Sequence, residues 1–159
     1  MGIRLVRSAG SVHEPAVVNM PASGVIHRDG LVIFDTATNV LSAPATTGAT
    51  TTNVIGVSLD GVTGASDTFV RVIPFVQGQL WEVDCVNVAA TSNLLFRHQM
   101  AGDLVVRNIT GASSSETLHT GIFLAYAMTG PTTGSGKLIG TFIQRLGSTL
   151  GKDGVTPTT

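Results

Sequence analysis

Apolar residues occur along this chain in short runs, many of them rich in β-branched side chains, and turn-forming residues separate the runs. The spacing of these turn signals is typical of β-strands. It predicts an all-β domain of roughly nine strands, a small barrel or sandwich. The clearest runs cover 3–7, 31–34, 54–59, 68–76, 80–86, 103–109, 121–128 and 137–145.

The stretch Gly24 to Gly61 is the most informative part of the pattern. Asp29-Gly30 lies between the apolar runs 24–28 and 31–34, and this dipeptide favours a type I′ turn, so we expect a tight hairpin. Residues 42–53 are almost all Ala, Thr, Gly, Pro and Ser and predict a loop. A second polar run, 63–67, predicts another loop. Pro74 lies inside the following run, 68–76, and places that part of the strand at an edge or a bulge.

Strict alternation marks the run Leu80 to Val86, LWEVDCV. In a strand it places Trp81, Val83 and Cys85 on one face, and Leu80, Glu82, Asp84 and Val86 on the other. Cys85 is the only cysteine, which excludes an intrachain disulfide and favours a small buried side chain. A single short helix is considered only at residues 87–95. The linker 129–136 predicts a longer hairpin loop between the last two strands.

Several of these elements, in this order, resemble the head-decoration proteins of tailed phages, which stabilise capsids. The resemblance lies in the strand 31–36 ending near Asp35, Val40-Leu41, the Ala/Thr/Gly-rich loop with 46–49, and the strand 54–57 leading into an Asp-containing turn. It continues through 69–75 to Trp81 and so covers roughly 23–86, under half of the chain. Two features depart from the family pattern. The chain continues for some seventy residues beyond Trp81, and its amino-terminal segment has an ordered, strand-like pattern from the start.

Composition agrees with a structural role. Hydrophobic residues make up 43% of the chain and charged residues only 12%, about half the usual charged fraction. Because charge keeps soluble monomers apart, we infer that copies of the chain or a partner cover much of its surface. The net charge of −1 offers no basic surface for nucleic acid, so no direct nucleic-acid partner is expected.

The chain is expected to form one domain at 23–150, preceded by an arm and first strands at 1–22 and followed by a tail at 151–159. The amino terminus lacks the apolar core of a secretory signal, and no run reaches the length of a membrane span. We therefore expect synthesis in the host cytoplasm and no membrane partner.

The search for chemistry gives few candidates, and neither an enzyme nor a cofactor is expected. Glu82 and Asp84 are close enough on one strand face to act as a catalytic or metal-binding pair, although such pairs are mostly solvated or salt-bridged. Trp81 and Tyr126 could stack on a sugar, but two isolated aromatics are more often core or subunit interface. The four histidines lack the spacing of zinc motifs and are expected to be structural; they are His13, His27, His98 and His119.

The resemblance implies a non-enzymatic, β-tulip-like cement protein that binds the major capsid protein on the outer surface of the mature head, as homotrimers. Its location would be the virion. By this reasoning the capsid contacts are expected in the amino-terminal arm, at Ile3, Arg4, Leu5, Val6 and Arg7, and the trimer interface at Phe75 and Trp81. The alternatives are a glycan- or receptor-binding module of a phage tail or fibre and, less favoured, a hydrolase that uses Glu82 and Asp84.

Overall fold

The computed structural model describes residues 2–7, 16–35, 37–44, 54–76, 78–85, 94–95, 97–101, 104–107, 122–129 and 136–143. These residues form eleven strands: β1 (Ile3–Arg7), β2 (Val18–Ile26), β3 (Leu31–Asp35), β4 (Val40–Ser42), β5 (Val54–Ser58), β6 (Val62–Pro74), β7 (Leu80–Cys85), β8 (Arg97–Ala101), β9 (Val105–Arg107), β10 (Phe123–Thr129) and β11 (Lys137–Phe142). The all-β prediction is confirmed. Within these ranges no helix has the length and apolar character needed to cross a membrane.

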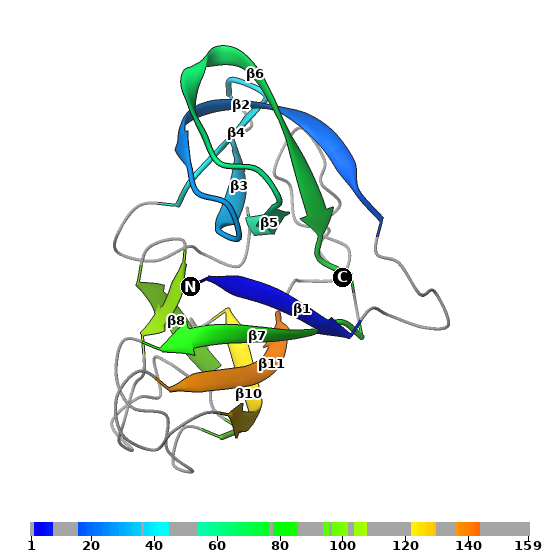
Figure 1. The fold of residues 1–159 in the computed structure, drawn as a ribbon, viewed down its shortest axis with the longest axis vertical. Coiled ribbons are helices and arrows are strands. Elements are labelled where there is room, and N and C mark those ends of the chain that lie inside the picture. Colours follow the sequence, from blue (N-terminus) through cyan, green and yellow to red (C-terminus); the bar gives the residue numbers. More distant parts are fainter. Residues whose placement is uncertain are drawn as a thin grey trace.

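Strands β2 to β6 close into a five-stranded barrel in the order β2-β4-β3-β5-β6. Alternation along the strands directs one set of side chains inward, as Val70 and Val72 of β6 illustrate. The fully buried residues of the barrel interior are aliphatic, and Met20, Phe34 and Val62 pack against them; the buried residues are Ala22, Ile26, Val32, Leu41, Ile55, Val70 and Val72. Figure 1 shows the barrel at the top of the molecule.

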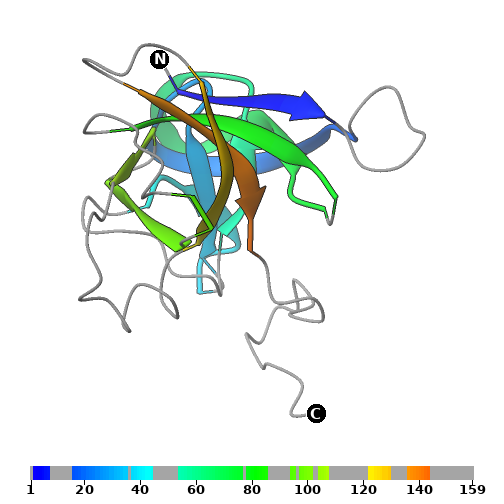
Figure 2. The same cartoon turned by 90° about the horizontal axis from the view of Figure 1, so that it is seen from below.

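The remaining strands form a second sheet in the order β1-β7-β11-β10-β8-β9. Its strands β1, β7 and β11 lie side by side, as Figure 2 shows. β9 pairs with β8 and also with the end of β7, at Asp84 and Cys85, so the pairing returns to β7. Since β11 takes one edge of β7, β1 and β9 follow one another along the opposite edge.

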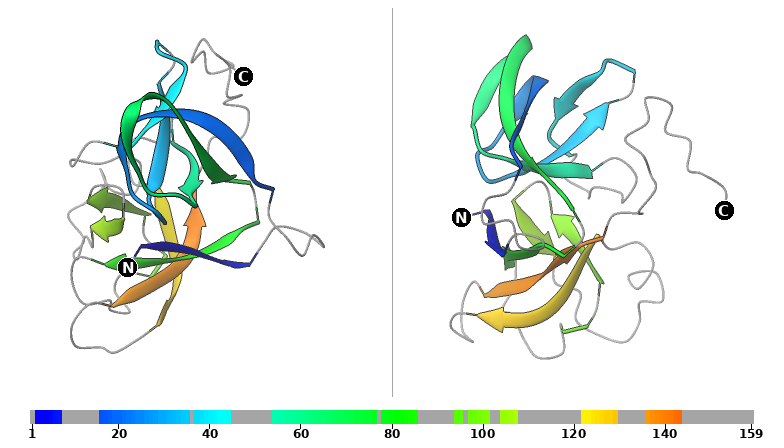
Figure 3. Two further views of the ribbon diagram at one scale, coloured as in Figure 1. Left: turned by 45° about the horizontal axis from the view of Figure 1, so that its top comes forward. Right: turned by 90° about the vertical axis from the view of Figure 1, so that its right-hand side faces the viewer.

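The two sheets share a larger core where the barrel rests on the second sheet (Figure 3). Leu31, Val57 and Ile73 of the barrel belong to the same buried cluster as Val83 and Leu138 of the second sheet. At its centre is a group of packed aromatic rings, and the ring centroids of Phe75 and Phe142 are 4.3 Å apart while those of Phe75 and Trp81 are 5.3 Å apart. Both sheets are therefore parts of one small domain.

Several local predictions were wrong. The turn at Asp29 does not close a hairpin, because β4 lies between β2 and β3 in the barrel, and only Asp29 of the turn dipeptide has a positive φ, 60°. Residues 63–67 continue β6 rather than forming a loop, since β2 pairs with this strand from Val62 to Val72. β2 also runs across the expected boundary at residue 22, so the first strands belong to the domain.

Other predictions hold or cannot be judged. Pro74 lies at an edge, as expected, because it is beyond the last pair of β6 with β2 and β6 is paired there only with β5. β10 and β11 pair as expected. Of the possible helix at 87–95, residues 87–93 lie outside the described residues and Leu94-Leu95 form a turn. The tail 151–159 also lies outside them.

Candidate functional site

A row of charged and polar side chains crosses four strands of the second sheet. The strand register explains it, because Arg4 of β1 lies opposite Glu82 of β7, and Asp84 of β7 lies opposite Lys137 of β11. Lys137 in turn lies opposite Thr129 of β10. Side chains directly opposite one another on one face of a sheet are in contact range. The fold therefore gathers this row from both ends of the sequence.

The two carboxylates of the row are buried, and every one of their oxygens faces a donor from this chain. Glu82 Oε1 lies 3.0 Å from Arg4 Nη2 and 3.3 Å from Lys137 Nζ, and Oε2 accepts a hydrogen bond from the Thr129 hydroxyl at 3.3 Å. Asp84 Oδ2 accepts from the backbone N–H of Gly2 at 3.0 Å, and its Oδ1 lies 3.6 Å from Lys137 Nζ.

This arrangement cross-links strands rather than presenting reactive groups. Glu82 and Asp84 are 8% and 5% exposed, and buried carboxylates are tolerated when cations and donors compensate them. A hollow of about 380 Å³ lies beside Arg4, Glu82 and Lys137, between β1 and the barrel. Among the described residues no group of three or more His, Cys, Asp or Glu side chains is placed to hold a metal ion.

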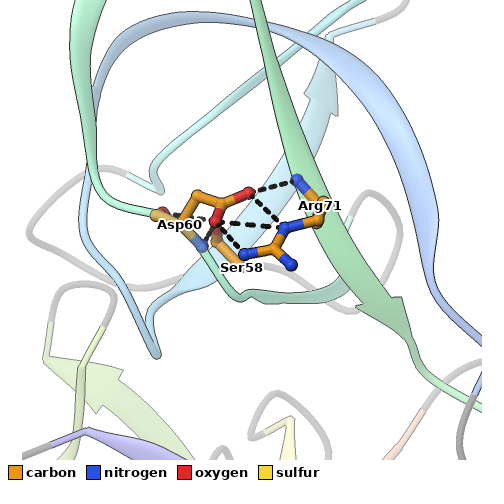
Figure 4. Close-up of polar contacts among 3 residues, drawn as sticks. All are labelled: Ser58, Asp60 and Arg71. Atoms are coloured by element: carbon orange, nitrogen blue, oxygen red, sulfur yellow. Dashed lines mark hydrogen bonds and ion pairs between the residues drawn. The ribbon is translucent and has the colours of Figure 1, made fainter.

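A second polar cluster fastens the turn between β5 and β6, where Ser58, Asp60 and Arg71 meet (Figure 4). The Arg71 guanidinium donates to both oxygens of Asp60, with Nη2 2.7 Å from Oδ1, and the Arg71 backbone N–H donates to Oδ2 at 2.9 Å. These bonds from Arg71 lower the pKa of Asp60 from 3.8 to about 2. Both acceptor oxygens are occupied, so the cluster is a turn clasp.

A mainly apolar pocket of about 420 Å³ lies at the edge of the shared core. Phe75, Phe142 and Leu124 line it, and Val76 and Tyr126 are half-exposed lining residues. A bulge in β10 between Ala125 and Ala127 sets the position of Tyr126. The Gln79 side chain in its wall is already hydrogen-bonded to Val76 N and Pro74 O. The pocket therefore offers mainly apolar contacts.

The five expected capsid-contact residues are those of β1, and the structure divides them. Ile3 is 2% exposed and belongs to the shared core, and Leu5 is partly buried against it. The Ile3 backbone N–H also donates to Asp29 O of the barrel at 2.8 Å. Arg4, Val6 and Arg7 are exposed. β1 is thus a strand of this chain's own second sheet, and Arg4, Val6 and Arg7 are its exposed side chains.

Phe75 and Trp81, expected at a trimer interface, are 6% and 1% exposed in the core of the single chain. Their rings pack against each other and against Phe142, so they cannot anchor another copy without opening that core. The same burial removes Trp81 as a sugar platform, whereas Tyr126 is 47% exposed.

The histidines do not form a common site in the described part of the chain. His98 is buried and His27 is exposed, while His13 and His119 lie outside the described residues. Cys85 is buried, as predicted.

Sequence reasoning placed Glu82 and Asp84 on one face but missed their partners. Lys137 is 55 residues from Glu82 along the chain, and Gly2 is 82 residues from Asp84. Only a partial signal for these partners was present in the sequence. Lys137 stands at the start of an apolar run, and a cation in that position is compatible with pairing to a side chain on a neighbouring strand.

Comparison of the chain with protein-family models, with curated proteins and with solved structures finds no match.

Proposed function

We propose that this chain is a non-enzymatic structural protein that coats a protein lattice, namely a decoration protein that binds the major capsid protein on the outside of a mature phage head as homotrimers. The observation that carries the proposal is the surface. Only 12% of residues are charged, and large apolar side chains remain exposed on both sheets, among them Phe69 of β6 at 65% and Val6 of β1 at 46%. Such a surface is suited to being covered.

The resemblance to head-decoration proteins supports the same proposal. Its described motifs, 31–35, 40–41 and 54–57, fall in β3, β4 and β5, three consecutive strands in the sequence that are neighbours in the barrel. The chain beyond Trp81 supplies most of the second sheet. Most of the resemblance thus lies in the barrel, and its last part, through Trp81, extends into β7 of the second sheet.

The candidate chemistry points away from catalysis. Donors of the chain itself occupy the carboxylates of Glu82 and Asp84, and Arg71 occupies Asp60. In a decoration protein the work would be thermodynamic, because a ligand that binds only the mature shell stabilises it by mass action. Many copies, each bound weakly, would add up through multivalency.

The exposed side of β1 is the proposed capsid contact, through Val6 and Arg7. Deleting residues 3–7 would not test this, since it removes Ile3 from the core. The double substitution Val6→Asp and Arg7→Glu changes only exposed side chains. We expect it to reduce binding to purified shells at least tenfold with unchanged unfolding. Val25→Asp, another exposed valine on β2, is the matched control.

The decisive measurement is the copy number of this chain relative to the major capsid protein in purified particles, determined by quantitative mass spectrometry. A ratio near one to one supports a protein that tiles the head. A handful of copies per particle contradicts decoration and favours the tail or a vertex, and absence from the particle refutes the proposal.

The alternative is glycan or receptor binding by a tail or fibre module, and one observation favours it. Tyr126 is a half-exposed ring that lines the 420 Å³ pocket, a position from which an aromatic can stack on a sugar. Glycan-array binding that is lost in Tyr126→Ala and kept in Val25→Ala, with both proteins folded, would support this alternative over decoration.

A further inference from the structure

We infer that Lys137 and Asp84 condense into an isopeptide bond between β11 and β7, and that Glu82 carries the protons of this reaction. The inference goes beyond the proposed function and does not depend on it. The row of polar side chains offers no open carboxylate to an outside substrate, yet its own members are placed to react with one another.

The amine and both carboxylates meet at one place on the second sheet. Lys137 of β11 lies directly opposite Asp84 of β7, and its Nζ is 3.6 Å from Asp84 Oδ1. The same Nζ donates to Glu82 Oε1 at 3.3 Å. A nucleophile, a carboxyl group and a proton acceptor therefore lie side by side. Groups that a fold holds together in this way react as if they were present at very high concentration.

The other contacts of the two carboxylates hold them in an orientation that suits the reaction. Thr129 donates to Glu82 Oε2, so Oε1 is the oxygen that faces the amine. Arg4 also pairs with Glu82, and this carboxylate keeps a counter-ion when the amine loses its charge. The backbone N–H of Gly2 donates to Asp84 Oδ2 at 3.0 Å, where it can stabilise the negative charge that develops on this oxygen during attack.

The ion pair contains all the atoms of the products. Lys137 Nζ passes a proton to Glu82 Oε1 and attacks Asp84 Cγ, which forms the N–C bond. After a second proton leaves the nitrogen, the bond from Cγ to Oδ1 breaks. Glu82 relays both protons to Oδ1, which departs as water. One ammonium and one carboxylate thus become one amide and one water molecule, with no oxidant, reductant or co-reactant.

Burial favours the amide over the separate ions. Asp84 and Glu82 are 5% and 8% exposed, so their charges are held away from most of the surrounding water, at a cost in desolvation. Condensation replaces one buried carboxylate and its cation with a neutral group. The Lys137 side chain is 46% exposed, which gives the released water molecule a path to solvent. The product is a covalent link between two strands that the register already holds side by side.

Mass spectrometry of the purified full chain tests the inference. We expect a mass that is lower than the sequence mass by one water molecule, and a tryptic product in which 72–97 is joined to 108–145 and is uncut after residue 137. Lys137→Arg keeps the positive charge but cannot form the amide, so this variant should retain the full mass. The matched control is Lys152→Arg, at the only other lysine of the chain, which should carry the bond.

Glu82→Gln tests the proton carrier. In samples taken during cell-free synthesis, this variant should form the bond at least about a hundredfold more slowly than the wild type, with circular dichroism to check that it folds. Bond formation at the wild-type rate would overturn the role assigned to Glu82. The wild-type mass needs no substitution, so it decides whether the bond exists even if Glu82→Gln does not fold.

Two results would overturn the bond itself. The first is a wild-type chain at its full sequence mass. The second is a loss of water without joined peptides, because Asp29-Gly30 and Asp60-Gly61 are sequences at which an aspartate can lose water by closing a succinimide ring on its own backbone. In that case Lys137→Arg would show the same loss of mass as the wild type.

Discussion

Gly140 occupies a position where even a methyl group cannot fit, and Gly140→Ala is therefore a sharp test of the second sheet. A Cβ at this position would collide with the carbonyl oxygen of Leu124, and would approach the Leu124 carbonyl carbon to 2.8 Å and Ala125 Cα to 2.9 Å. These are backbone atoms, so no rotamer change relieves the contact. The β10 bulge beside Ala125 brings the two strands together here.

Neither strand is free to withdraw. β10 is paired on its other side with β8, at Phe123 and Leu124, and β11 is held by β7, where Gly140 lies opposite Trp81. Overpacking in such a setting costs about 3 kcal/mol. The lower entropy of alanine in the unfolded chain returns up to about 1 kcal/mol. We expect a net loss of about 2 kcal/mol, or about 6 °C in Tm for a domain of this size.

Urea unfolding followed by the emission of Trp81 measures the loss, because Trp81 is the only tryptophan and is 1% exposed in the core. The matched control is Gly61→Ala, where the nearest atom to an added Cβ, Arg28 N, is 3.5 Å away. It should stay within about 0.5 kcal/mol of wild type. If Gly140→Ala also unfolds within about 0.5 kcal/mol of wild type, the close approach of β10 and β11 is wrong.

Three further predictions concern the polar clusters and the core. Asp60 has a folded pKa of about 2 against an ordinary pKa of 3.8, so its stabilising effect is complete above about pH 4 and is lost as pH falls through 2. In urea titrations between pH 5 and 2, the wild type should lose about 1 kcal/mol more of its free energy of unfolding than Asp60→Asn. Equal losses in the two proteins would contradict a stabilising role for the Asp60–Arg71 contact. Glu82→Gln should lower the free energy of unfolding by about 2 kcal/mol at neutral pH. Arg4→Gln should lower it by less than about 1 kcal/mol, because the Arg4 side chain is 72% exposed. The reverse order in chemical denaturation would refute the idea that the buried Glu82 carboxylate is the centre of the row. Trp81→Ala should lower the free energy of unfolding, measured by circular dichroism melts, by about 4 kcal/mol. A variant as stable as the wild type would contradict the burial of Trp81 in the core.

Local sequence pattern was sufficient where a strand's two faces differ. The alternation of Leu80 to Val86 predicted an apolar face and a second face that carries both carboxylates. The structure has Trp81, Val83 and Cys85 in the core, with Glu82 and Asp84 opposite. What the pattern could not supply was that both faces are buried. That depends on Arg4 and Lys137 arriving from distant strands, which is a property of the register and not of the segment.

The order of the strands, and the strands without clear alternation, could not be predicted from the sequence, for related reasons. Asp29-Gly30 carries a strong local turn signal, yet β4 takes the place next to β2 because the closed barrel requires it. Arg97–Ala101 was not expected to be a strand, since RHQMA shows no clear alternation; its partners β10 and β9 hold it in the sheet. Long-range pairing overrides local preference in such segments.

The distribution of charge connects the fold to its proposed role. The chain has nine basic and ten acidic side chains, and at least six of the nineteen are paired within the chain, at Arg4, Lys137, Glu82, Asp84, Asp60 and Arg71. Charges used to fasten strands do little to keep copies apart. Association of the chain as the proposed homotrimer should therefore be nearly independent of salt, because large apolar side chains are exposed on its surface. Between about 0.1 and 1 M NaCl the screening length falls from about 10 to 3 Å, and we expect the association constant measured by sedimentation to change less than about threefold. A change of tenfold or more would show that ionic contacts, and not apolar side chains, hold the copies together.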